Sequence, residues 1–221
     1  MVSRRLTAIA CAIALCITGT ALAPASASAQ DPILFVHGYV ESASLWNTMI
    51  ANFEKDGYPK SFLSAYSYNT SQSNKIDAEE VKTKVEALLK TTGATKVDIV
   101  AHSMGSLNSR WYVKFLGGEA KVDDWVSLGG PNHGTETANF CFSTSCVEMR
   151  VGSKFLAELN AGDETPGTVN YGTWWSPCDE IINPDSSVAL TGATNTKTAC
   201  ISHTALTTDK TVYEQVREFV K

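Results

Sequence analysis

The chain has 221 residues, of which 43% are hydrophobic and 19% charged, and its formal net charge is −5 at pH 7. Its length suits one domain with a sizeable core, and its acidic balance argues against a nucleic acid or an anionic membrane as a partner.

The first 29 residues have the pattern of a secretory signal peptide. Arg4 and Arg5 give a positive start, residues 6–23 form an uncharged, largely apolar stretch, and the small residues at 27–29 offer a cleavage site. A membrane anchor is the alternative, but no second apolar run long enough to span a bilayer follows. We therefore expect a secreted, extracellular protein in which residues 30–221 form a single domain.

After residue 30, short apolar runs alternate with segments whose apolar residues recur at helical spacing. Strands are expected at residues 33–36, 61–68, 97–101, 123–130, 168–175 and 197–202, and amphipathic helices at residues 45–53, 76–89, 107–116 and 212–220. This alternation predicts an α/β fold with about six mainly parallel strands and helices on both faces of the sheet. In such sheets ligands bind outside the carboxyl ends of the strands.

The segment AHSMG, residues 101–105, lies between the third predicted strand and the helix after it. A sharp strand-to-helix turn here would lift the hydroxyl of Ser103 above the sheet, as in the nucleophile elbow G-x-S-x-G, with Ala101 in place of the first glycine. The alternative is that Ser103 is only the N-cap of the helix. The flanking strand and helix are the context that the motif requires, so they favour a nucleophile.

A serine nucleophile needs a base, and the chain has four histidines: His37, His102, His133 and His203. In this fold the order along the chain is nucleophile, acid and histidine. His203, which follows the last predicted strand, is therefore the favoured base. We interpret His133 as a loop residue that is fixed by hydrogen bonds, and we expect His102 to point away from Ser103.

The acid should follow the strand before the base, where three carboxylates stand: Asp179, Glu180 and Asp185. Asp179 is favoured because the cysteines give an independent geometric argument. If Asp179 orients the histidine, Cys178 and Cys200 come within bonding reach. An even number of cysteines in an exported chain is typical of disulfides rather than of a metal site, so we predict the pairs Cys178–Cys200 and Cys141–Cys146. The alternative is that the bridge only stabilises the protein and Asp179 begins a turn.

An acyl-enzyme mechanism also needs hydrogen-bond donors for the oxyanion. One donor is the backbone N–H of Met104, directly after the nucleophile. The second is expected in the loop after the first strand, where Gly38 permits an unusual turn and the N–H of Tyr39 is the candidate.

Together these segments resemble the small secreted bacterial lipases of class 2 in the α/β-hydrolase superfamily, both the minimal Bacillus lipases and their actinobacterial relatives. The resemblance is carried by ILFVHGY, VDIVAHSMGSLNSRWYVKFLGG, WVSLGGPNHGT, FLAELNAGDETPG, the segment around Asp179 and ISHTAL. It implies a minimal α/β-hydrolase with the following site residues: Ser103 as nucleophile, Asp179 as acid, His203 as base, and Tyr39 and Met104 as oxyanion donors.

The resemblance implies a serine lipase that hydrolyses triacylglycerol and related carboxylic esters through an acyl-enzyme, at a lipid–water interface. Alternatives with the same triad are a broader carboxylesterase, a phospholipase, a polyester hydrolase or an acyltransferase. An inactive secreted binding protein is an alternative of another class, against which the complete set of serine, acid and histidine argues. We expect no cofactor, no metal, no stable membrane insertion and no stable oligomer.

Residues 131–167 form a longer segment than the smallest lipases have. We interpret it as a wall of the acyl pocket with limited mobility rather than as a large lid, so interfacial activation should be weak or absent. Large apolar side chains are candidates for the surroundings of the acyl chain, with the core as the alternative for each: Tyr39, Trp46, Leu107, Trp174 and Trp175.

Overall fold

The computed structural model describes residues 30–221, so the predicted signal peptide at residues 1–29 lies outside the described residues. Within this part, six parallel strands form one sheet in the order β2-β1-β3-β4-β5-β6. The strands are β1 (Ile33–Val36), β2 (Leu63–Ala65), β3 (Val97–His102), β4 (Val122–Leu128), β5 (Asn170–Trp175) and β6 (Thr194–Lys197). The predicted α/β fold with about six mainly parallel strands is confirmed.

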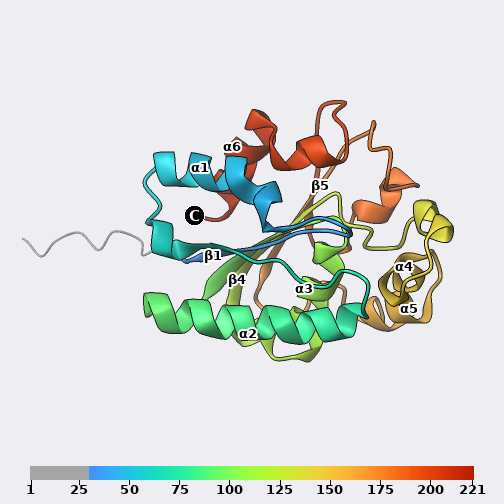
Figure 1. The fold of residues 1–221 in the computed structure, drawn as a ribbon, viewed down its shortest axis with the longest axis horizontal. Coiled ribbons are helices and arrows are strands. Elements are labelled where there is room, and N and C mark those ends of the chain that lie inside the picture. Colours follow the sequence, from blue (N-terminus) through green and yellow to red (C-terminus); the bar gives the residue numbers. More distant parts are fainter. Residues whose placement is uncertain (1–29) are drawn as a thin grey trace, which may run out of the picture.

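Helices cover both faces of the sheet (Figure 1). On one face lie α1 (Asn47–Lys55) and α6 (Lys210–Phe219), and on the other α2 (Asn74–Thr92) and α3 (Gly105–Phe115). Strands β1 and β3 are buried along their whole length, as expected for parallel strands covered on both sides. Two apolar cores result, one on each face. The first contains Leu34, Val85, Ile99, Leu107 and Trp125, and the second Phe35, Trp46, Phe53, Val126 and Tyr213.

Two short helices lie in the segment between β4 and β5, which was predicted to be a pocket wall. They are α4 (Thr144–Met149) and α5 (Lys154–Leu159). Each begins at a serine whose side chain accepts a hydrogen bond from a backbone N–H of the first turn, Ser143 for α4 and Ser153 for α5.

The last strand differs from its prediction. It was expected at residues 197–202, but β6 spans Thr194–Lys197, and residues 198–202 have no regular structure. The apolar run around Ile201 resembled a buried strand, whereas the true strand is polar and mostly exposed because it is the edge of the sheet. Strand β2, predicted over residues 61–68, is likewise shortened to three residues at the opposite edge.

Candidate active site

Ser103 lies on a sharp turn between β3 and α3. Its backbone φ is 53°, in the left-handed region that non-glycine residues rarely adopt, and its N–H donates to the carbonyl of Leu128 at 2.9 Å. A Cβ added to Gly105 would lie 2.5 Å from the carbonyl oxygen of Val36, so the turn needs a glycine there. The strand, turn and helix that the elbow motif requires are therefore present, with Ser103 at its tip.

His203 and Asp179 meet beside this turn. His203 Nδ1 lies 2.8 Å from Asp179 Oδ2, and both side chains are almost completely buried. The other carboxylate oxygen, Oδ1, accepts hydrogen bonds from the N–H groups of Ile181 and Ile182, each at 2.9 Å. The carboxylate is thereby fixed in the orientation that keeps the Nδ1 proton on the imidazole and leaves Nε2 as the basic atom.

The electrostatics of this pair suit a general base. Burial alone would raise the pKa of Asp179, but the hydrogen bond and the charge of His203, with the two backbone donors, hold it below its usual value. Burial lowers the pKa of His203, and the hydrogen bond that its imidazole donates to Asp179 opposes that effect only in part. His203 is therefore neutral near pH 7, which is the form that can accept a proton.

Two disulfides pair the cysteines as predicted. Cys178 and Cys200 are bonded with their Cα atoms 5.0 Å apart, and they join the segment of Asp179 to the segment of His203. Cys141 and Cys146 are bonded with Cα atoms 5.8 Å apart, within the segment between β4 and β5.

An apolar pocket of about 490 Å³ opens beside Ser103 and His203. Its remaining wall is mainly apolar and includes Val40, Ala138, Phe140, Met149, Ile181 and Ile182. Among the described residues, the hydroxyl of Ser103 has no hydrogen-bond partner, so it faces the pocket unengaged. As expected, the segment between β4 and β5 forms a wall of this pocket.

The loop after β1 passes close to Ser103. A Cβ on Gly38 would lie 2.6 Å from the Cβ of Ser103, so only glycine allows this approach. The approach brings the next residue, Tyr39, to the rim of the pocket. Within residues 30–221 neither the N–H of Tyr39 nor that of Met104 donates a hydrogen bond, so both amides are available to a ligand.

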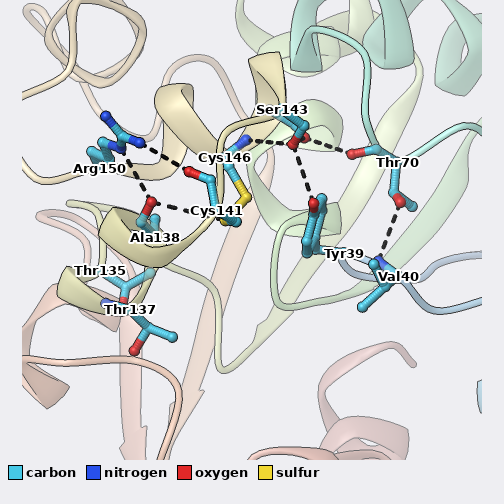
Figure 2. Close-up of a disulfide and its surroundings, with 11 residues drawn as sticks. Tyr39, Val40, Thr70, Thr135, Thr137, Ala138, Cys141, Ser143, Cys146 and Arg150 are labelled. Atoms are coloured by element: carbon cyan, nitrogen blue, oxygen red, sulfur yellow. Dashed lines mark hydrogen bonds between the residues drawn. A yellow bond between two sulfur atoms is a disulfide. The ribbon is translucent and has the colours of Figure 1, made fainter.

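Figure 2 shows how the Cys141–Cys146 loop is fastened to its surroundings. Arg150 donates from Nε to the carbonyl of Ala138 at 3.1 Å and from Nη2 to that of Cys141 at 2.9 Å. The hydroxyl of Ser143 donates to the hydroxyl of Tyr39 at 3.3 Å.

Thr70 makes a second connection between this loop and the loop after β1 (Figure 2). Its carbonyl accepts from Ser145 Oγ at 2.6 Å, and its Oγ1 accepts from the N–H of Val40 at 3.2 Å. Val40 has a φ of 54°, an uncommon value for a β-branched residue. These contacts hold the backbone beside Tyr39 in a conformation that it would not readily adopt alone.

Four other candidates for the acyl pocket do not line it. Trp46, Leu107 and Trp174 are buried in the two cores, and Trp175 lies half-buried with Lys197 over its ring. Periodicity identified these side chains as apolar and inward-facing, but it did not distinguish the core from the pocket. The residues that sequence reasoning missed are Val40, Ala138, Phe140, Met149, Ile181 and Ile182.

The remaining histidines do not line the pocket. His133 is held by Glu164, 2.7 Å from its Nε2, and by the carbonyl of Ser187, which agrees with its interpretation as a fixed loop residue. His37, directly after β1, stacks on Tyr68. His102, next to Ser103, is completely buried.

Residues 30–221 contain no group of three His, Cys, Asp or Glu side chains placed to hold a metal ion. Nor does this part of the chain contain a helix with the length and apolar character needed to cross a bilayer.

Known proteins share this sequence pattern. The family model described as "Lipase (class 2)" matches residues 30–220. Over 120 residues the chain is 26% identical to a triacylglycerol lipase of Pseudarthrobacter phenanthrenivorans, a match that covers 52% of this chain and 37% of that protein. It is also 26% identical over 120 residues to a triacylglycerol lipase of Burkholderia plantarii, covering 52% of this chain and 33% of that protein. The matched region thus spans about a third of each of these two relatives.

The fold is shared with a solved lipase. The mature form of the Bacillus licheniformis lipase BlEst2 superposes with a TM-score of 0.79 and 17% sequence identity, over 91% of this chain and 96% of that one. At this identity the likeness concerns the fold alone. The family match, in contrast, extends over nearly every residue that the structure describes, and the chain therefore belongs to the class 2 lipases, a family of the α/β-hydrolase type.

Proposed function

We propose that this chain is a serine lipase that hydrolyses carboxylic esters, triacylglycerols among them, through an acyl-enzyme. One observation carries the proposal: Ser103 stands on a strand-to-helix turn beside the Asp179–His203 pair, and all three lie at an apolar pocket. Family membership supports the same reaction class.

The chemistry begins with proton transfer from Ser103 to Nε2 of His203 as the serine oxygen attacks the ester carbonyl. Asp179 stabilises the imidazolium that forms. His203 then protonates the leaving alcohol, and the acyl group remains on Ser103. A water molecule repeats the sequence, with His203 as its base, and releases the fatty acid.

The developing oxyanion is stabilised by two backbone donors, the N–H groups of Tyr39 and Met104. Two observations support this assignment: both amides lack a partner among the described residues, and Gly38 brings the first of them close to Ser103. Because the loop is held in place before substrate binds, the donors need not reorganise during the reaction.

The surface around the pocket supports action at a lipid–water interface. Val40 is 78% exposed and Phe140 86% exposed, and both line the pocket. Phe142, on the other side of Cys141, is 83% exposed. Exposed apolar groups of this kind at the mouth of an apolar pocket favour contact with a lipid phase, where they leave water.

The decisive experiment measures fatty-acid release from emulsified triolein by the wild type and by a Ser103→Ala variant. Release by the wild type and none by the variant is expected. If neither releases acid from triolein but the wild type cleaves a short soluble ester, the activity is that of an esterase and the lipase proposal is wrong.

The interface is tested by binding to a triolein emulsion. The double variant Phe140→Ser/Phe142→Ser should bind more weakly, whereas its rate on a soluble ester should change little. Ile76→Ser, at an exposed isoleucine of α2 outside the pocket lining, is the control and should bind like the wild type. Equal binding by all three proteins would contradict this role of the phenyl groups.

Export from the cell is part of the proposal. It is supported by the pattern of residues 1–29 and by the two disulfides, which form in oxidising compartments. Sequencing the N-terminus of the secreted protein should give Gln30 as its first residue.

A further inference from the structure

His102 is a completely buried histidine whose two ring nitrogens both face acceptors. Nδ1 lies 2.9 Å from Oε2 of Glu41, and Nε2 lies 3.1 Å from the backbone carbonyl oxygen of His203. A neutral imidazole has one N–H and can satisfy only one of them. Both contacts are hydrogen bonds only if the ring is an imidazolium, with the Glu41 carboxylate as its counter-ion.

Glu41 belongs to the loop that carries Tyr39. The same carboxylate oxygen that faces His102 also accepts the N–H of Gly38 at 2.7 Å. Burial alone would raise the pKa of Glu41, but the hydrogen bond and the charge of His102, together with the donor from Gly38, bring it below its usual value. The carboxylate is therefore ionised, as a counter-ion must be.

The pair connects three parts of the site that the chain supplies separately: the loop after β1, the end of β3 beside Ser103, and the backbone of His203. We propose that the buried His102–Glu41 ion pair is a positioning device, which holds the loop of Tyr39 and the backbone of His203 in register and keeps the net charge beside His203 near zero. The proposal rests on the ester hydrolysis proposed above, because it assigns the pair to that same site.

The charge effect follows from the geometry. The rings of His102 and His203 have their centroids 4.5 Å apart. Burial is the largest influence that lowers the pKa of His203; the cation of His102 lowers it further, and the carboxylate of Glu41 raises it. Removing one partner therefore leaves an uncompensated charge beside the base, and its sign depends on which partner is removed.

Other titratable groups face the pair and the base. Asp179 accepts from His203 Nδ1, and Glu180 accepts the backbone N–H of His203 at 3.0 Å. His37, at the end of β1, lies close enough for the charges of His102 and Glu41 to act on it. These groups are unchanged in the variants below, so differences from the wild type report on the pair.

The test measures kcat/KM against pH for p-nitrophenyl butyrate, a soluble ester. The variants are His102→Asn, Glu41→Gln and the double variant. Each single variant should lose about 10- to 100-fold in kcat/KM, the cost of misplacing a reacting group by roughly 1 Å. In His102→Asn the isolated Glu41 carboxylate stabilises the imidazolium of His203, so the acid limb of the profile should move to higher pH. In the double variant the limb should return towards its wild-type position.

The matched control is His133→Asn, which breaks a second pair of histidine and glutamate among residues 30–221; its two side chains are 2.7 Å apart and outside the pocket lining. It should leave both the rate and the acid limb unchanged. If His102→Asn loses rate while its acid limb stays in place or moves to lower pH, the residue is only part of the packing and the charge role is refuted.

A measurement on the wild type does not depend on activity or on the folding of variants. Nitrogen NMR of ¹⁵N-histidine-labelled protein at pH 7 should find His102 protonated on both ring nitrogens, and a neutral ring would overturn the proposal. Absence of ester hydrolysis by the wild type would refute the proposed function, and the NMR result would still decide whether the ion pair exists.

Discussion

Removal of the Cys178–Cys200 bridge should lower the free energy of unfolding by an amount that follows from the length of the loop that it closes. The two cysteines are 22 residues apart in the chain, and both are exposed. Replacing them with alanine therefore opens no cavity in the core, and the loss should come from the restored freedom of the unfolded chain. Closing a loop of this length contributes about 3 kcal/mol. For a domain of this size that corresponds to a decrease in Tm of roughly 10 °C.

The assay is urea unfolding of the wild type and of Cys178→Ala/Cys200→Ala, followed by tryptophan fluorescence. The variant Cys178→Ser/Cys200→Ser is the matched control, because exposed alanine and serine should differ little. The urea dependence of the free energy should steepen in both variants, since the unfolded chain without the cross-link exposes more surface. A loss below about 1 kcal/mol, or an alanine variant much less stable than the serine variant, would refute the loop-entropy reasoning.

Activity at 25 °C should survive this change better than stability. Ser176 also joins the two segments: its hydroxyl donates to the carbonyl of Ile201 at 2.5 Å and accepts the N–H of Ile201 at 3.0 Å. The hydrogen bond between Asp179 and His203 is a further link. A folded variant whose kcat falls more than about tenfold would mean that the bridge itself positions the acid and the base, since small misplacements cost that much.

Three further predictions concern protonation and packing. Because burial lowers the pKa of His203, the acid limb of kcat/KM for a soluble ester should have its midpoint below the ordinary histidine value of 6.5, and a midpoint above 6.5 would contradict this. Burial raises the pKa of Asp77 to about 7. The contribution of this carboxyl group to the free energy of unfolding is therefore complete below its unfolded pKa and is lost as the pH rises through 7. In urea unfolding the wild type should be less stable at pH 8 than at pH 5 for this reason, and Asp77→Asn should remove that difference. Gly105→Ala places a methyl group 2.5 Å from the backbone of β1. It should lower the free energy of unfolding, measured in urea, by about 1–3 kcal/mol and remove most of the activity. Unchanged stability would show that the turn at Ser103 can relax.

The sequence was sufficient to predict the strands that are buried on both faces, because each of them is a continuous run of mainly apolar residues. Strands β1 and β3 are covered on both faces, so ILFV and VDIVA stand out from their surroundings. The position of Ser103 followed from the strand before it and the helix after it. The pairing of Cys178 with Cys200 followed because each is close in sequence to a member of the Asp179–His203 pair.

Prediction from the sequence failed for residues whose role depends on which other parts of the chain cover them. Strand β6 has the sequence TNTK at an exposed edge, and nothing in those four residues separates them from a loop. Residues that line the pocket could not be distinguished from core residues, because both are apolar. Trp46 lies in the core whereas Phe140 lines the pocket, and this difference depends on the path of the chain between β4 and β5, which the sequence pattern does not reveal. Glu41 gave no signal, since a carboxylate in a polar loop is ordinarily solvated.

The group of Ser103, Asp179 and His203 and the pocket wall that contains Phe140 are held in place by different contacts. This difference determines which of the two can accept substitutions. The proposed catalytic groups, Ser103, Asp179 and His203, follow buried strands of the sheet or are fixed by buried hydrogen bonds, so a change there would alter the core as well as the proposed chemistry. The wall containing Phe140 is instead held by its own disulfide and by the two hydrogen bonds that Arg150 donates to backbone carbonyls. Backbone carbonyls accept whatever the side chain is, so residues on the wall can be replaced without loss of these contacts. If the pocket binds the acyl chain as proposed, substitutions at the wall should change acyl-chain preference while the positions of Ser103 and His203 are kept.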